Sequence, residues 1–182
     1  MIKNLRFDQI FHQHYHYFNL NSLKNLVNRL ECKIISTDIN YNFWGGSLMI
    51  AFKKHSRKKN FLKNTYKSMN LDISKKYKIF KKHHKDLNKM LRKKTNLIGY
   101  GAGQMVPSLA YHLKSDLSFL KYIVDDNKNR ENQKYPNLKP KIKFFNKNLL
   151  SGGVLITALD GVNSISKKLK KLKTLYYSPL VK

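Results

Sequence analysis

The run from Asn96 to Gly103 constrains the fold more than any other part of this 182-residue sequence. It reads Asn-Leu-Ile-Gly-Tyr-Gly-Ala-Gly, so a short apolar segment leads directly into three alternating glycines. Apolar residues then recur at the spacing of one helix face, at Met105, Leu109, Ala110 and Leu113. A strand, a glycine turn and a helix in this order are typical of the first unit of a Rossmann-like α/β domain.

The sequence after this unit alternates further strand and helix patterns. Apolar runs predict strands over 119–124, 142–145, 154–159 and 175–177, and a helix over 163–172. Strands that alternate with helices through short loops predict a mostly parallel sheet with right-handed crossovers. We therefore predict a Rossmann-like α/β domain over residues 95–182.

Residues 1–53 are aromatic and apolar, with a simpler pattern. Asn21-Ser22 is a candidate helix N-cap before apolar residues at helical spacing, and 33–39 and 47–52 read as two strands able to pair antiparallel. A helix and two strands bury too little surface to form a free-standing core. We expect this segment to be the end of a larger sheet or a cap on the C-terminal domain.

Residues 54–94 are Lys-rich and are interpreted as a helical connector. Their apolar side chains step mostly by three or four residues, at Phe61, Leu62, Tyr66, Met69, Ile73, Tyr77, Phe80, His84, Leu87 and Leu91. A break is expected near 70–74, where Asp72 or Ser74 can cap a second helix. The lysines are interpreted as a solvated face.

The formal net charge of +27 first suggests nucleic acid, because a basic surface gains affinity by releasing phosphate counterions. The excess is mostly Lys spread over the whole chain, whereas specific readers of nucleic acid rely on Arg. Nucleic-acid binding is therefore considered unlikely. The same charge suits a smaller anion such as a nucleotide diphosphate.

Compartment and metal content follow from what the sequence lacks. It contains no apolar run of about 18 residues and no signal-peptide pattern, which favours a soluble cytoplasmic protein. The single Cys32 cannot form an internal disulfide, and no Cys/His spacing predicts a structural zinc site.

The glycine turn admits two interpretations. Gly99, Gly101 and Gly103 have GxGxG spacing, while the third glycine of GxGxxG would fall at Gln104. In a dinucleotide fold such glycines let a phosphate approach the turn, and an acidic residue such as Asp125 at the end of the second strand binds ribose. Alternatively, glycines simply allow a sharp turn and close packing.

Three alternating histidines, His12, His14 and His16, would share one face of an extended segment. One interpretation is a metal site, although Asp8 is the only carboxylate nearby. A second is acid–base catalysis, since imidazole titrates near neutral pH. The third is ordinary aromatic-like packing.

The histidines belong to a longer run, from Phe7 to Leu23, that resembles the FDxIYHEHLxYFSLxSL signature of S-adenosylmethionine-dependent sugar C-methyltransferases. Gly45-Gly46-Ser47-Leu48 matches the GGSL of that family at the expected spacing. The glycine turn together with Ile123-Val124-Asp125-Asp126-Asn127 is similar to the family's extra C-terminal domain. The resemblance covers nearly the whole chain.

The resemblance implies that His14 is the general base that removes a proton beside the ketone of a nucleotide-linked keto sugar. The enolate would then take the methyl group of S-adenosylmethionine. The resemblance also implies that Phe11, His12 and Gln13 line the pocket and that the C-terminal domain helps to hold the nucleotide sugar, through Gly99, Gly101, Gly103 and Asp125. No metal ligand is assigned.

Two departures from the family pattern shape the functional hypothesis. Phe11 and Gln13 stand where the family has Tyr and Glu, which removes a phenol and a carboxylate that orient or polarise the base. The family's zinc module and S-adenosylmethionine-binding half precede the histidine motif and are not expected in this chain. Residues 1–53 would then be the C-terminal remnant of a class I methyltransferase domain.

Several functions remain open on these grounds. The resemblance leaves three hypotheses. The chain is one part of a split methyltransferase whose partner chain binds the methyl donor, or it is a truncated remnant, or it is a domain reused to bind nucleotide sugars. The alternatives from other classes are a non-catalytic α/β module that binds a nucleotide and a basic nucleic-acid-binding protein.

Overall fold

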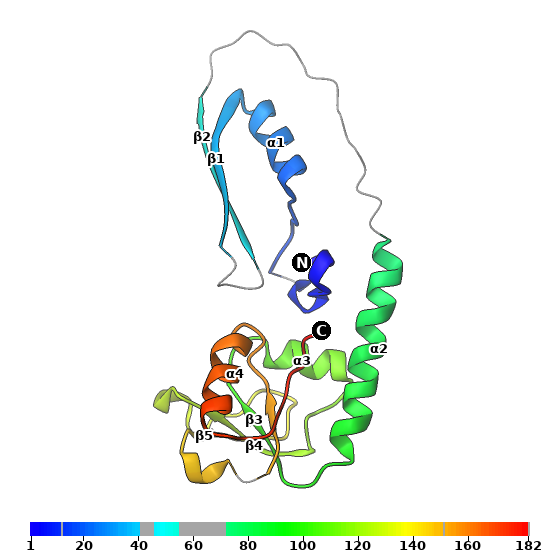
Figure 1. Ribbon diagram of the computed structural model, residues 1–182, viewed down its shortest axis with the longest axis vertical. Coiled ribbons are helices and arrows are strands. Elements are labelled where there is room, and N and C mark those ends of the chain that lie inside the picture. The colour runs from blue at the N-terminus through cyan, green and yellow to red at the C-terminus, as the bar shows by residue number, and fades with distance from the viewer. Residues whose placement is uncertain (12, 41–45, 55–71, 151, 182) are drawn as a thin grey trace. The chain divides into compact units, whose positions relative to one another are not determined.

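The computed structural model describes residues 1–11, 13–40, 46–54, 72–150 and 152–181 (Figure 1). The chain forms two compact units. The first comprises Met1 and Ile10–Ile73, and the second comprises Ile2–Gln9 and Ser74–Lys182. The segment Ile2–Gln9, which includes the beginning of the histidine-rich run, therefore belongs with the C-terminal part of the chain.

The residues of the first unit that the structure describes form one helix and one strand pair. Helix α1 spans Leu20–Arg29, and strands β1 (Cys32–Asn40) and β2 (Ser47–Lys54) form a two-stranded sheet. The strands are antiparallel, and their pairing runs from Cys32 opposite Lys54 to Asn40 opposite Ser47. The predicted helix and antiparallel pair are confirmed.

The start of α1 differs from the prediction. The N-cap is Asn19, whose side-chain oxygen accepts a hydrogen bond from the Ser22 amide at 2.9 Å. The Ser22 hydroxyl accepts in return from the Asn19 amide, also at 2.9 Å. The predicted cap at Asn21-Ser22 lies two to three residues too late, because Ser22 acts from inside the helix as the second member of a capping box.

The second unit is built on one five-stranded sheet. Its strands are β3 (Leu97–Tyr100), β4 (Leu120–Asp125), β5 (Ile142–Phe144), β6 (Val154–Ile156) and β7 (Tyr176–Tyr177). The strand order is β5-β4-β3-β6-β7, and every neighbouring pair is parallel. The predicted Rossmann-like parallel sheet is confirmed.

Three α-helices accompany this sheet: α2 (Ile73–Arg92), α3 (Val106–Leu113) and α4 (Val162–Lys171). Short 3-10 helices lie at Ile2–Asn4, Phe7–Gln9, Lys128–Arg130 and Lys147–Leu149. Pro107 stands in the first turn of α3, where its missing N–H costs nothing. Within the described residues, no helix is both long and apolar enough to span a membrane.

The predicted apolar stripe of the connector is confirmed from Phe80 onward, whereas its earlier members Ile73 and Tyr77 are 51% and 40% exposed. Phe80, His84, Leu87 and Leu91 are the buried residues of α2. They recur every three or four positions, so they lie on one side of the helix. The earlier members of the stripe, between residues 61 and 69, lie outside the described residues.

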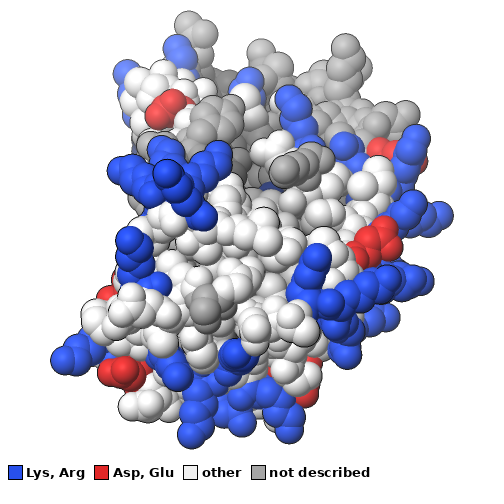
Figure 2. Space-filling view, turned by 60° about the horizontal axis from the view of Figure 1, so that its bottom comes forward, with Lys and Arg blue, Asp and Glu red and all other residues white. Residues whose placement is uncertain are grey.

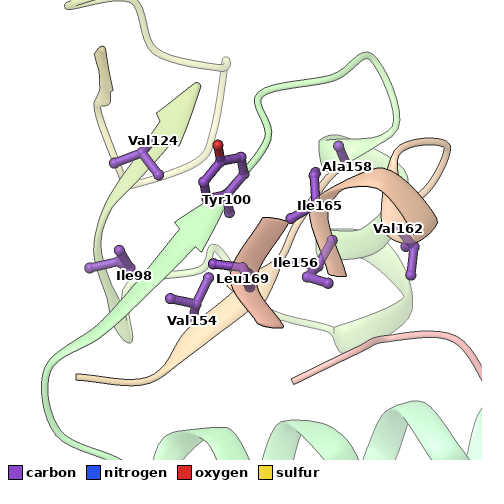
Figure 3. Packing of buried hydrophobic residues seen from close by; sticks show 9 residues of the cluster. All are labelled: Ile98, Tyr100, Val124, Val154, Ile156, Ala158, Val162, Ile165 and Leu169. Atoms are coloured by element: carbon purple, nitrogen blue, oxygen red, sulfur yellow. The ribbon is translucent and has the colours of Figure 1, made fainter. Parts of the chain in front are cut away.

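The core of the second unit lies on both faces of its sheet. Figure 3 shows strand residues such as Ile98 and Ile156 together with Ile165 and Leu169 of α4, and all of them are buried. On the other face Leu155 is fully buried as well. Burying each such side chain contributes about 1.5–3 kcal/mol, so this sheet is stabilised from both sides.

The N-terminal segment completes this unit. The Phe7 side chain is buried, with its ring centroid 5.3 Å from that of Tyr77 and 5.6 Å from that of Phe80. The Ser108 hydroxyl of α3 donates to the main-chain oxygen of Asp8 at 3.3 Å. Ile2–Gln9 is therefore part of the C-terminal unit in packing as well as in hydrogen bonding.

Candidate functional site

The glycine turn follows the central strand of the five-stranded sheet. From β3 the chain proceeds to β4 on one side, and only later returns to β6 on the other side. The carboxyl end of β3 is therefore the point at which the direction of winding reverses. Open α/β sheets bind their ligands in the crevice outside such a switch point.

The three glycines differ in what the fold requires of them. A Cβ on Gly99 would lie 2.8 Å from Cγ1 of Ile123. Gly101 has φ of +96°, and a Cβ there would collide with that of Ala158. Gly103 has no such dihedral angle, and its nearest obstacle is the Asp160 carboxylate at 3.3 Å. Close packing and turn geometry thus explain Gly99 and Gly101.

Both neighbouring strands hold the turn in place. The Gly101 amide donates to the Val124 carbonyl of β4 at 2.8 Å. The buried Thr157 hydroxyl, just beyond β6, donates to the Gly101 carbonyl at 2.7 Å. The next amide, that of Ala102, donates to the Asp125 carboxylate at 2.6 Å.

Asp125 is the residue that the sequence placed at the ribose position. Its carboxylate also accepts from the Asn127 amide at 2.9 Å and from Nη1 of Arg130 at 3.2 Å, and the side chain is only 10% exposed. With the Ala102 bond, both carboxylate oxygens are occupied within the protein. Asp125 therefore braces the glycine turn, and its contact with a substrate stays a prediction.

The adjacent carboxylate, Asp126, is exposed and is held from two sides. The Tyr100 hydroxyl donates to it at 2.9 Å, and Nζ of Lys168 donates at 2.7 Å. Burial, and then the hydrogen bond to Asp126, raise the pKa of Tyr100. The phenol therefore stays protonated and remains a hydrogen-bond donor at physiological pH.

These groups surround one cleft of about 320 Å³ within the second unit. Its lining residues come from the ends of β3, β4 and β6 and the segments after them: Tyr100, Gly101, Gly103, Gln104, Asp125, Asp126, Arg130, Ala158, Asp160, Gly161 and Ile165. The Asp160 carboxylate makes no hydrogen bond to any residue that the structure describes. The cleft thus combines a glycine turn with three carboxylates.

A tyrosine from the loop beyond β4 supports the turn. The Tyr135 hydroxyl donates to the Gly103 carbonyl at 2.8 Å. Burial raises the pKa of Tyr135 to about 12, so this donor also keeps its proton. The Gly103 carbonyl is thus anchored within the protein.

The predicted catalytic histidine lies in the first unit. The His14 amide donates to the Phe11 carbonyl at 3.0 Å, which bends the chain into a turn at this point. The His14 ring lies 4.2 Å from the Phe11 ring and 6.0 Å from the Tyr17 ring.

Exposure makes this histidine accessible to a ligand. His14, His16 and Gln13 are all exposed, while Phe11 is half-buried. His12 lies outside the described residues. The predicted site residues thus form two groups, one around His14 in the first unit and one around the glycine turn in the second.

The structure adds a buried ion pair that the sequence analysis did not identify. Nη2 of Arg6 lies 2.8 Å from Oδ2 of Asp8, and the two side chains are 8% and 2% exposed. Nη2 of Arg6 also donates to the Leu159 carbonyl at 3.4 Å. The sequence carries no signal for the contact between Arg6 and Leu159, because these residues lie 153 positions apart.

A second unforeseen feature is a pair of histidines in the second unit, of which His84 is buried and His112 is half-buried. The ring centroids of His84 in α2 and His112 in α3 are 5.6 Å apart. Burial lowers the pKa of both side chains, and that of His84 falls to about 4. Helical periodicity placed His84 on the apolar stripe, but it could not show a histidine partner on another helix.

Among the residues that the structure describes, no three His, Cys, Asp or Glu side chains are grouped so as to hold a metal ion. No protein-family model matches the sequence, and no curated protein matches it either. The functional interpretation therefore depends on the residues themselves.

Proposed function

We propose that this chain is the C-terminal portion of an S-adenosylmethionine-dependent C-methyltransferase that acts on a nucleotide-linked keto sugar. The observation that carries the proposal is the run from Phe7 to Leu23, followed by GGSL and, on the same chain, by a Rossmann-like unit with a cleft at its switch point. Helix α1, which begins within the run at Leu20, and the hairpin after it suit the end of a larger sheet.

In this proposal His14 is the general base. Its imidazole takes a proton from the carbon beside the ketone, and the electron pair left on that carbon forms an enolate. The enolate carbon attacks the methyl group of the sulfonium, and the C–S electron pair leaves with the neutral thioether S-adenosylhomocysteine. Phe11, whose ring lies 4.2 Å from that of His14, positions the imidazole.

The rest of the predicted pocket is assigned by the resemblance. His12 and Gln13 would line the sugar site together with Phe11. Gly99, Gly101, Gly103 and Asp125 would belong to the nucleotide end of the substrate, on the second unit. S-adenosylmethionine would be bound by a segment outside these 182 residues, such as a partner chain.

The first unit has features that suit such a partner. Its sheet consists of β1 and β2 alone, so each strand has one edge without a partner among the described residues. Large apolar side chains on it are exposed, including Ile39, Phe52 and Met49. Open strand edges and exposed apolar residues are the usual components of an interface that extends a sheet.

A non-catalytic nucleotide-binding module is the second candidate, because the cleft lies at the switch point of a parallel sheet. This module would use the same cleft as the proposed methyltransferase, but His14 would have no chemical role in it. A nucleic-acid-binding role is less well supported. On the face that Figure 2 shows, Lys and Arg side chains form several separate groups around a largely uncharged centre and do not form one continuous stripe.

Proton exchange separates these candidates without the methyl donor. The full chain would be incubated in D₂O with a UDP-linked or dTDP-linked 4-keto-6-deoxy sugar, and NMR would follow deuterium entering beside the ketone. We expect enzyme-dependent exchange that His14→Ala slows by about 100-fold or more. The matched control is His16→Ala, also at an exposed position of this segment, which should leave the rate unchanged.

Calorimetry on the same samples separates the remaining outcomes. Nucleotide-sugar binding with little binding of S-adenosylmethionine supports the proposal. Binding without exchange favours the non-catalytic module, and an unchanged rate in His14→Ala removes the role of that residue. DNA binding with a steep salt dependence, and no nucleotide-sugar binding, would establish the nucleic-acid alternative.

A further inference from the structure

One lysine of α4 is held between two aromatic rings and a carboxylate. Nζ of Lys168 lies 3.8 Å from the centroid of the Phe145 ring and 5.3 Å from that of the Tyr100 ring. The same atom donates to Oδ1 of Asp126 at 2.7 Å. We call the three residues around this ammonium group, Tyr100, Asp126 and Phe145, the cation cage.

The cation cage is built at the ends of three neighbouring strands. Tyr100 is the last residue of β3, Asp126 follows β4 directly, and Phe145 follows β5 directly. The rings of Tyr100 and Phe145 lie 5.3 Å apart, and the Tyr100 hydroxyl donates to Asp126. The cage residues are thus held by the sheet and by one another, whereas Lys168 comes from a helix outside the sheet.

Other lysines that lie over aromatic rings lack this combination. Nζ of Lys81 lies 5.4 Å from the Tyr77 ring, and Nζ of Lys143 lies 4.4 Å from the Tyr122 ring. Each faces a single ring, and neither forms an ion pair with a carboxylate of the described residues. Several aromatic faces together with a negative charge are what proteins use to bind quaternary ammonium groups.

Lys168 occupies the cation cage without being strongly held there. The side chains of Lys168 and Asp126 are 37% and 59% exposed. An exposed ion pair contributes little to stability, and ordering a long side chain costs rotamer entropy. A methylated ammonium group has the same charge but is less strongly hydrated than the lysine ammonium, so it loses less on moving onto aromatic faces.

We propose that the cation cage binds a methylated ammonium group and that Lys168 is its internal competitor. Tyr100 and Asp126 also line the cleft of about 320 Å³, which leaves room beside the cage for the rest of a small ligand. The carboxylate of Asp126 selects a cation over an anion or a neutral group. The proposal is independent of the methyltransferase proposal, because it gives no role to His14.

The test compares choline with its neutral analogue, in which carbon replaces the nitrogen of the trimethylammonium group. NMR titrations of the full chain at constant ionic strength would follow the amide signals of Asp126 and Phe145. We expect choline to shift these signals and the neutral analogue to leave them in place. Lys168→Ala should bind choline about tenfold more tightly than the unaltered chain, because the internal competitor is gone.

The matched control is Lys167→Ala, which removes the same charge from the neighbouring exposed position of α4. It should leave the affinity for choline unchanged. An equal gain in Lys167→Ala and Lys168→Ala would overturn the proposal, because the effect would then be one of general charge. Binding of the neutral analogue as tightly as choline overturns it as well.

Two further variants test the cage residues in the Lys168→Ala background. Phe145→Leu keeps an apolar side chain but removes the aromatic face, and it should weaken choline binding by about tenfold. Asp126→Asn keeps the shape of the side chain but removes its charge, and it should weaken binding to a similar extent. Unchanged affinity in both variants overturns the proposal.

A third ligand identifies the source of the ammonium group. Nε-trimethyl-lysine, capped at both ends, would be titrated beside choline. Tighter binding of the amino acid supports a cage for a modified protein side chain, and tighter binding of choline supports a small-molecule site. If Lys168→Ala binds neither, the proposal is wrong. Choline binding without proton exchange removes the methyltransferase proposal alone, and exchange without choline binding removes the cation cage alone.

Discussion

The two units of this protein contain similar apolar residues and use them differently. All four residues of β3 and all three of β6 in the second unit are buried. In the first unit, no residue of β1 or β2 is buried among the described residues, and Val27 is the buried residue of α1. Apolar strand composition alone therefore does not make a core.

The difference has a topological cause. Parallel strands joined by helices place those helices on the faces of the sheet. The faces of the sheet in the second unit are therefore covered by helices of the same unit. In the described residues of the first unit, the antiparallel hairpin has one helix and no further strand at its edges, which leaves much of its apolar surface uncovered. The first unit is thus the part of the chain whose stability would increase most on binding a partner.

The largest effect should come from matched truncations in the two sheets. Ile156→Ala in β6 and Ile39→Ala in β1 remove the same atoms, but their side chains are 0% and 43% exposed. We expect Ile156→Ala to cost about 2–5 kcal/mol and Ile39→Ala less than about 1 kcal/mol. Hydrogen exchange of the β6 and β1 amides measures each unit separately.

Equal losses of stability in the two variants would contradict this difference between the units, since they would mean that the first unit has a core of its own. The same pair of variants also sharpens the proposed function. If a partner chain covers the first unit, Ile39→Ala should weaken that association while leaving the isolated chain nearly as stable as before.

Acid should destabilise the second unit through His84. Burial lowers the pKa of this side chain from 6.5 to about 4, with His112 and His83 acting in the same direction and Asp8 opposing them. Between those pH values the unfolded chain binds more protons than the folded one. Stability is therefore full above pH 6.5 and falls by roughly 3 kcal/mol as the pH drops to about 4.

Thermal unfolding followed from pH 7 to pH 4 measures this loss, and His84→Leu should remove most of it. Some dependence should remain, because burial lowers the pKa of His112 too. His16→Leu, at an exposed position of the first unit, is the control and should leave the profile as it is. An unaltered profile in His84→Leu would show that the acid sensitivity arises elsewhere.

The smallest effect is expected at the cap of α1. Asn19→Ala removes the side chain that accepts from the Ser22 amide, which costs about 1 kcal/mol. Because α1 belongs to the first unit, hydrogen exchange should quicken there and stay constant in β3 and β6. Faster exchange throughout the chain would instead mean that the two units unfold together.

The order of the elements was largely readable from local patterns. Glycines after an apolar run located β3 and its turn, helical spacing from Met105 located α3, and two strand-like runs at 33–39 and 47–52 located the hairpin. The error at Asn19 has a simple cause. Ser22 is a good N-cap by residue type, and only the backbone conformation shows that it acts as the third residue of the helix.

The candidate site was only partly readable, because side-chain direction is decided by distant contacts. Asp125 was correctly placed at the end of a strand, but its carboxylate turns inward to the Ala102 amide. Asp160 carried no signal in the sequence, since it reaches the cleft only when β6 pairs with β3. His14 was singled out by resemblance, and its function stays a prediction.

By itself, the sequence determined that the chain contains a glycine turn between a strand and a helix, an antiparallel hairpin and an apolar helical stripe, because these patterns are set by residues close together along the chain. The tertiary structure decided that Arg6 and Asp8 are buried and form hydrogen bonds with residues 153 and 100 positions away. It also decided that the carboxylates gather around one cleft. Such contacts depend on how the elements pack, which local periodicity does not encode.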